Sequence, residues 1–171
     1  RIFLTGFPFP KQILGNRDLD VLREDQAQRL FYLDPKDRFW PLHGQSVVHF
    51  LGRNSCKFKN KRRLTITYAV GGAGAQKEFG WQIARSLRDK LKAGEVALNL
   101  VAGVRAEINE YFEGVKMDIL PGSPHLRVIY SPSKDEYFDL FAEAIRHTDL
   151  LWTKPSELSF YVGLGIPIIM S

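Results

Sequence analysis

The last two thirds of the chain alternate short apolar runs with longer segments whose apolar residues recur at helical spacing. The runs lack regular polar alternation, which is typical of strands covered on both faces. We expect strands at Leu64–Val70, Val96–Val101, Leu126–Tyr130, Asp149–Thr153 and Ile166–Met170. Helices are expected between them, over about 76–92, 104–115, 134–145 and 156–162. This alternation predicts an α/β fold: a Rossmann-like open parallel sheet of about five strands with helices on both faces.

The helix after the third strand has a clear start signal. Ser133 and Glu136 have the spacing of a capping box, in which the serine caps the helix and the glutamate reaches back. We expect this helix to turn Phe138, Phe141, Ala142 and Ile145 toward the core.

The first 63 residues have a less regular pattern. Residues 1–10 are interpreted as an interdomain strand and linker, and 11–63 as a helical insertion or extension. One helix is expected over Asp18–Leu33 and a shorter one over Gly44–Leu51, with Pro35 and Pro41 breaking the stretch between them. The candidate core positions of the first helix are Leu19, Leu22, Ala27, Leu30 and Phe31. Residues 64–171 form the Rossmann-like domain, which we expect to be truncated at both ends because the chain starts and stops in strand-like runs.

The composition limits the class of protein but does not indicate a function. The chain has 171 residues, 44% hydrophobic and 25% charged, as in an ordinary globular domain. Its formal charge is +5, part of it in a basic run made of Lys57, Lys59, Lys61, Arg62 and Arg63. A solvated loop is the favoured interpretation, and a peripheral membrane contact of the intact protein stays open. No nucleic-acid-binding signature accompanies the run, so no nucleic acid is expected. A single cysteine, Cys56, favours a reducing, cytoplasmic setting.

A glycine-rich turn follows the first expected strand and opens a helix. It consists of Gly71, Gly72, Ala73, Gly74, Ala75 and Gln76. Glycines let a ligand approach the backbone amides, and the start of a helix favours an anion such as phosphate. The turn does not match the dinucleotide-binding fingerprint, because Lys77 occupies the position of its third glycine. It does not match a P-loop either, because no Gly-Lys-Ser/Thr follows.

A second turn follows the fourth expected strand. Thr153, Lys154, Ser156 and Glu157 lie where a strand passes into a short helix. Hydroxyls, an ammonium group and a helix start are all suited to an anion, although the same residues also suit an ordinary N-cap.

Together these segments resemble a known family. ITYAVGGAGAQ resembles the first strand and glycine loop of the C-terminal domain of GT-B glycosyltransferases, such as the peptidoglycan N-acetylglucosaminyltransferase and monogalactosyldiacylglycerol synthase. DLLWTKPSELSFYVGLGIPIIM is similar to that family's strand, turn, helix and G-[IVL]-P strand, and Thr5-Gly6-Phe7-Pro8 to its domain-entry turn.

The resemblance implies a nucleotide-sugar-binding domain, with a UDP-sugar as the expected substrate and no metal or other cofactor. Residues 71–76 and 153–157 would lie beside the diphosphate and sugar, and Gly103, Val104, Tyr130 and Ser131 near the base. Phe160 stands where these relatives commonly carry a ribose-binding glutamate. The acceptor-binding domain would be a missing N-terminal partner, so the catalytic residues stay unknown and the fragment is expected to be inactive. A degenerate GT-B-like domain that binds a partner or acts as a scaffold is the alternative, and a sugar-nucleotide epimerase is a third hypothesis.

Overall fold

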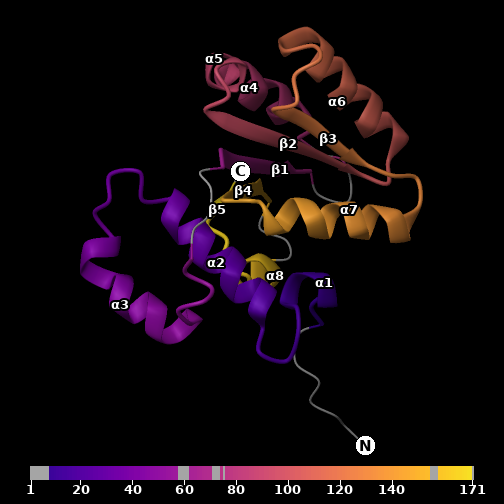
Figure 1. Cartoon of the computed structure of the whole chain (residues 1–171). Coiled ribbons are helices and arrows are strands. Elements are labelled where there is room, and N and C mark those ends of the chain that lie inside the picture. Colours follow the sequence, from indigo (N-terminus) through magenta and orange to yellow (C-terminus); the bar gives the residue numbers. More distant parts are fainter. Residues whose placement is uncertain (1–7, 58–61, 71–73, 75, 155–157, 171) are drawn as a thin grey trace, which may run out of the picture.

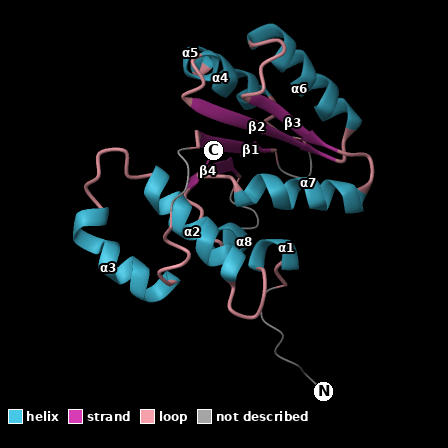
Figure 2. Ribbon diagram, in the orientation of Figure 1, coloured by secondary structure: helices cyan, strands magenta, loops and turns pink. Residues whose placement is uncertain are grey.

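The computed structural model describes residues 8–57, 62–70, 74, 76–154 and 158–170. It contains one sheet of five parallel strands in the order β3-β2-β1-β4-β5 (Figures 1 and 2), which confirms the predicted α/β fold with an open parallel sheet. The strands are β1 (Leu64–Ala69), β2 (Val96–Gly103), β3 (Leu126–Tyr130), β4 (Leu150–Thr153) and β5 (Ile168–Met170). The chain runs outward from β1 to β3 and returns to β4 on the other side of β1. The strand order therefore reverses between β1 and β4, the place where open α/β sheets bind ligands.

Helices cover both faces of the sheet (Figure 1). One face carries α4 (Glu78–Ser86), α5 (Arg88–Lys92) and α6 (Ala106–Ile119), and the other carries α7 (Lys134–Arg146), α8 (Leu158–Gly163), α1 (Lys11–Leu14) and α2 (Asp20–Tyr32). Helix α3 (Trp40–Leu51) lies farther from the sheet and packs on the outer side of α2. The single helix expected over 76–92 is two helices, with Leu87 between them.

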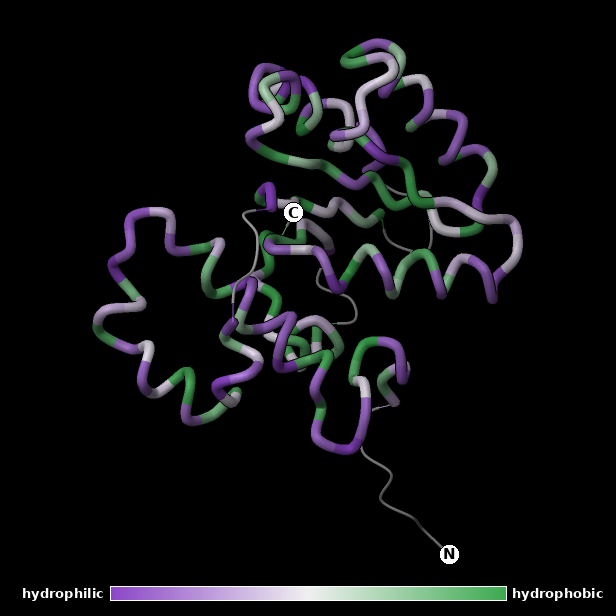
Figure 3. Tube along the Cα trace, in the orientation of Figure 1, coloured by the Kyte–Doolittle hydropathy of each residue, from purple (hydrophilic) through white to green (hydrophobic). Residues whose placement is uncertain are grey.

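Each face of the sheet has its own apolar core. Leu98, Leu100 and Phe112 are fully buried on the α4–α6 face, while Leu151 and Ile145 are buried on the α7–α8 face. The α7 tube alternates between green and purple in Figure 3, as expected for a helix with one apolar face. Phe141, Ala142 and Ile145 pack against the core as predicted, together with Tyr137. Phe138 was also expected to point inward, but it is 60% exposed.

The amino edge of the sheet is held by a buried carboxylate. Asp149 has no exposed surface and accepts two hydrogen bonds of 2.6 Å from the Arg62 guanidinium. It also accepts the backbone N–H of Thr65 at 2.8 Å. The Arg62 guanidinium lies 4.5 Å from the ring centre of Tyr32, whose hydroxyl accepts the Arg62 N–H. One carboxylate thus joins the start of β1, the start of β4 and the end of α2.

Helix α2 is fixed to the sheet by charged side chains as well as by part of the apolar stripe that its sequence predicts, since Leu22 packs against the core. Arg29 is buried and donates to the carbonyl oxygens of Thr148 at 2.7 Å and Leu164 at 3.0 Å. Burial lowers the pKa of Arg29, and the negative charges of Asp149 and Asp25 oppose that shift. Ala27 is buried as predicted, whereas Leu19 is 36% exposed in a left-handed backbone conformation before the helix begins.

Helix α3 begins four residues earlier than the predicted Gly44. The Asp34 carboxylate accepts the backbone N–H groups of Arg38, Phe39 and Trp40 at 2.8 to 3.1 Å, which satisfies donors at the start of the helix. Pro41 was expected to break this stretch but lies in the first turn of α3. Proline is tolerated there because the helix needs no N–H from that position.

We expect Asp149→Ala to lower the free energy of unfolding by about 3–5 kcal/mol, because it leaves the Arg62 guanidinium partly buried without its carboxylate. Glu95→Ala is the matched control, since Glu95 forms an exposed pair with Lys90 at 3.7 Å that contributes at most about 1 kcal/mol. Urea unfolding followed by circular dichroism measures both. Equal effects would contradict the role of Asp149.

Two helical glycines give a test of the packing between α4 and α6. A methyl group on Gly80 would lie 2.5 Å from a ring carbon of Phe112, whereas one on Gly114 would meet no atom within 4 Å. We expect Gly80→Ala to destabilise the fold by about 1–3 kcal/mol. Gly114→Ala should stabilise it by about 0.4–1 kcal/mol. Thermal unfolding of the two variants checks the opposite signs.

Candidate functional site

The two turns singled out by sequence leave the same edge of the sheet. Strands β1 and β4 are parallel neighbours in which Ala69 pairs with Thr153, so the chain after both residues emerges side by side. Of the predicted phosphate-binding residues, the structure describes Gly74, Gln76, Thr153 and Lys154. Gly71, Gly72, Ala73, Ala75, Ser156 and Glu157 lie outside the described residues.

Gly74 fits closely against the start of α6. Its φ is +67°, and a methyl group there would lie 2.9 Å from Cδ1 of Ile108 and 3.9 Å from Cδ of Arg105. Only glycine accepts both the backbone conformation and the close approach without strain. Gly74 is thereby placed beside the segment that follows β2.

Gln76 has an unusual environment for a polar residue. Its φ of +69° is left-handed, and its carbonyl oxygen accepts the Tyr68 hydroxyl at 2.5 Å. Burial raises the pKa of Tyr68 to about 12, and the nearby negative charge of Glu78 adds to the shift, so this phenol remains a donor. The side-chain oxygen Oε1 of Gln76 is buried without a hydrogen-bond partner among the described residues. Such an acceptor is costly to leave unpaired.

Strand β4 supplies a second atom of this kind. Trp152 pairs with Tyr68 across β1 and β4, and its indole Nε1 is also buried without a partner in the part of the chain that is described. Thr153 behaves differently, because its buried hydroxyl donates to the Ala69 carbonyl oxygen at 3.2 Å. The hydroxyl hydrogen of Thr153 therefore closes β4 onto β1 and is not directed at a phosphate.

The predicted base-binding residues lie at the ends of β2 and β3. Gly103 has a φ of +72° and open space where a side chain would be, and Val104 is 39% exposed beside it. The Ser131 N–H donates to the Gly103 carbonyl at 3.3 Å, which joins the two strand ends. Tyr130, the last residue of β3, lies opposite Gly103. The structure thus brings Gly103, Val104, Tyr130 and Ser131 together.

Ser131 is tied into the start of α7. It is buried, donates its hydroxyl to the Glu136 carboxylate at 2.6 Å and accepts the Ser133 N–H at 3.1 Å. Ser133 caps α7 as predicted by accepting the Glu136 N–H. The Glu136 carboxylate, however, binds the Ser131 hydroxyl instead of reaching back to the Ser133 backbone.

Charged groups at this edge are mixed in sign. Lys77 lies over the Tyr111 ring at 4.9 Å, and Arg105 pairs with Glu107 at 3.3 Å. The pKa of Glu107 is lowered by a hydrogen bond from its own backbone N–H, with Arg105 and Lys77 contributing. Lys154 takes part in no ion pair of the described residues. Sequence reasoning missed Lys77 and Arg105 as site residues; the only available signal was that each immediately precedes a helix.

Phe160 replaces the glutamate implied by the resemblance and has a packing role. Its ring stacks on Phe9, with centroids 5.4 Å apart and planes inclined by 27°, and it packs against the core of the α7–α8 face.

Within the described ranges, no group of three or more His, Cys, Asp and Glu is arranged to hold a metal ion. No helix in those ranges is long and apolar enough to cross a membrane. Comparisons of the chain with protein-family models, with curated proteins and with solved structures found no match.

We expect Ser131→Ala to cost about 0.5–1.5 kcal/mol of stability, because the exposed Glu136 carboxylate and Ser133 N–H both lose the buried hydroxyl that binds them. Ser86→Ala is the control, since that hydroxyl only donates back to the Ile83 carbonyl of its own helix. Chemical denaturation compares the two. Indistinguishable variants would show that Ser131 does not anchor the loop after β3.

Proposed function

We propose that the chain is the nucleotide-sugar-binding domain of a GT-B-like glycosyltransferase, with a UDP-sugar as ligand. The observation that carries the proposal is the adjacency of β1 and β4, because it brings the glycine turn and the Lys154 turn to one edge at the switch point of the sheet. The cytoplasmic location and the second, acceptor-binding domain are parts of the same proposal.

The polar atoms at this edge support a ligand with both phosphate and hydroxyl groups. The Trp152 indole offers a buried donor and the Gln76 amide a buried acceptor; Trp152 pairs with Tyr68 across the strands, and the Tyr68 hydroxyl bonds the Gln76 backbone. A phosphate only accepts hydrogen bonds at neutral pH, whereas a sugar hydroxyl both donates and accepts. A diphosphate sugar would therefore satisfy the indole, the amide and the Lys154 ammonium together. Gly103, with open space at its α-carbon, leaves room for a planar base to approach the backbone.

In the intact protein, the role of this edge would be electrostatic. Glycosyl transfer releases a nucleoside diphosphate, and the negative charge that develops on the leaving oxygen is stabilised by fixed donors and cations. Lys154 and the first turns of α4 and α6 are the described groups suited to that role. The nucleophile would come from the acceptor, and the general base from the second domain.

A degenerate, non-enzymatic binding domain is the second candidate, and Phe160 favours it. Its stack on Phe9 fills with hydrophobic packing the position at which the family commonly binds ribose. Phe160→Glu would place a charge against the α7–α8 core, so restored ribose binding is not expected from that substitution alone.

Titration of ¹⁵N-labelled protein with UDP and UDP-sugars tests the proposal. We expect amide shifts concentrated at Gly74, Gln76, Gly103 and Lys154, with tighter binding of a UDP-sugar than of UDP. Lys154→Ala should weaken binding about tenfold, the effect of losing a charge-assisted hydrogen bond. Trp152→Phe removes only the indole donor and should weaken binding several-fold.

Trp81→Phe is the matched control, because the Trp81 indole N–H already donates to Asp118 at 2.9 Å. A folded protein that binds no UDP-sugar would support the degenerate domain instead. Shifts confined to regions remote from the carboxyl ends of β1, β2 and β4 would contradict the site.

A further inference from the structure

An exposed apolar surface lies on α3, far in sequence from the candidate site. Leu42 is 77% exposed and Phe50 is 74% exposed, the two most exposed large hydrophobic residues of the described chain. They lie on one helical row, because eight residues separate them with Ser46 between. No Asp, Glu, Lys or Arg occurs anywhere in α3.

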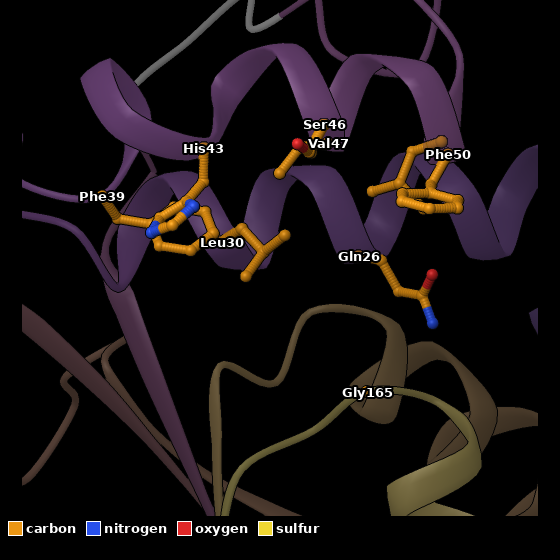
Figure 4. A pocket seen from close by; sticks show the side chains of 9 residues that line it. Gln26, Leu30, Phe39, His43, Ser46, Val47, Phe50 and Gly165 are labelled. Carbon is orange, nitrogen blue, oxygen red and sulfur yellow. The ribbon is translucent and has the colours of Figure 1, made fainter.

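This row borders an apolar groove between α3 and α2. The groove has a volume of about 420 Å³ and is lined mainly by Leu30 of α2 and by Phe39, Val47, Phe50 and Leu51 of the α3 segment. Figure 4 shows Leu30, Phe39, Val47 and Phe50 at the two helices, with Gly165 below them. The exposed row and the groove form one apolar surface, which we call the α3 surface.

Lys36 and Asp37, just before α3, offset each other, and the sequence beyond them is basic. From Arg38 to Lys77 the sequence contains eight Lys or Arg residues and no Asp or Glu. Arg62 and Arg63 are used within the fold, by Asp149 and by the Gly94 carbonyl. Arg38 and Arg53, which flank α3, and Lys57 are exposed and form none of the ion pairs found in the described ranges.

A helix that exposes Leu and Phe and is flanked by exposed cations can dock at a membrane interface. The apolar side chains enter the acyl boundary while the cations contact anionic headgroups. The Asp34 carboxylate keeps its negative charge and attracts Arg38, so the cations that remain for the headgroups are Arg53 and Lys57. We propose that the α3 surface docks the protein peripherally on an anionic lipid bilayer. The proposal is independent of the nucleotide-sugar site.

Co-sedimentation with lipid vesicles tests this directly. The chain should bind vesicles of mixed phosphatidylcholine and phosphatidylglycerol, bind phosphatidylcholine vesicles far less, and dissociate as salt screens the charges. The double variant Leu42→Glu/Phe50→Glu should lower the partition coefficient at least tenfold, on the order expected when two exposed apolar side chains can no longer be buried.

Phe138→Glu is the matched control, because Phe138 is a 60% exposed phenylalanine on a different helix. It should bind vesicles like the parent chain, and circular dichroism confirms that all variants remain folded. Arg53→Glu/Lys57→Glu should reduce binding only to the anionic vesicles. Absence of vesicle binding, equal loss in Phe138→Glu, or equal binding to both lipid compositions would overturn the proposal. Sedimentation velocity without lipid tests whether the α3 surface binds a second copy of the chain instead. A dimer that dissociates in the Phe50→Glu variant would overturn the lipid proposal and assign the surface to a dimer interface.

Discussion

The arrangement of this domain depends on a single buried carboxylate at the amino edge of its sheet. Asp149 binds the Arg62 guanidinium and the Thr65 backbone, so the entries of β4 and β1 are held together before either strand begins. A buried charge is tolerated only when such partners surround it. Because parallel strands that start together also end together, this contact fixes the neighbouring positions of the two turns at the opposite edge.

The two edges of the sheet therefore have different chemistry. At the amino edge most polar groups are paired with one another: Arg29 donates to two carbonyls, and the Thr67 and Thr148 hydroxyls lie 2.7 Å apart, although the buried Nε of Arg62 has no hydrogen-bond partner among the described residues. At the carboxyl edge the Thr153 and Ser131 hydroxyls are paired, whereas the Trp152 indole and the Gln76 amide oxygen have no partner in the described part of the chain. Buried polar atoms without a partner are rare in folded proteins, so the two at the carboxyl edge support the proposed ligand site.

The helical segment before the sheet has two sides with separate roles. Through Arg29 and the Asp25–Arg146 pair at 2.9 Å, α2 is joined to the domain by buried or half-buried charges. Through Leu30, α2 contributes to the apolar surface that α3 presents outward. Helix α2 thus lies between the sheet and α3 (Figure 1), and it contacts the amino edge of the sheet, opposite the candidate ligand edge.

The sequence by itself determined the α/β class and the alternation of strands and helices along the chain. Buried parallel strands need uninterrupted apolar runs, and the helices that connect them need helical periodicity. It also located the two turns, since glycine and capping residues are local signals. Only the tertiary structure decided which polar groups are already paired. Thr153 and Ser131 are site candidates in the sequence, and Phe160 stands where the resembled family commonly carries a ribose-binding glutamate. Each of the three makes contacts to residues that spacing cannot foresee. The same holds for Arg29 and Asp149: a charged residue carries no local sign of burial, because its environment is built by segments that lie far apart along the chain.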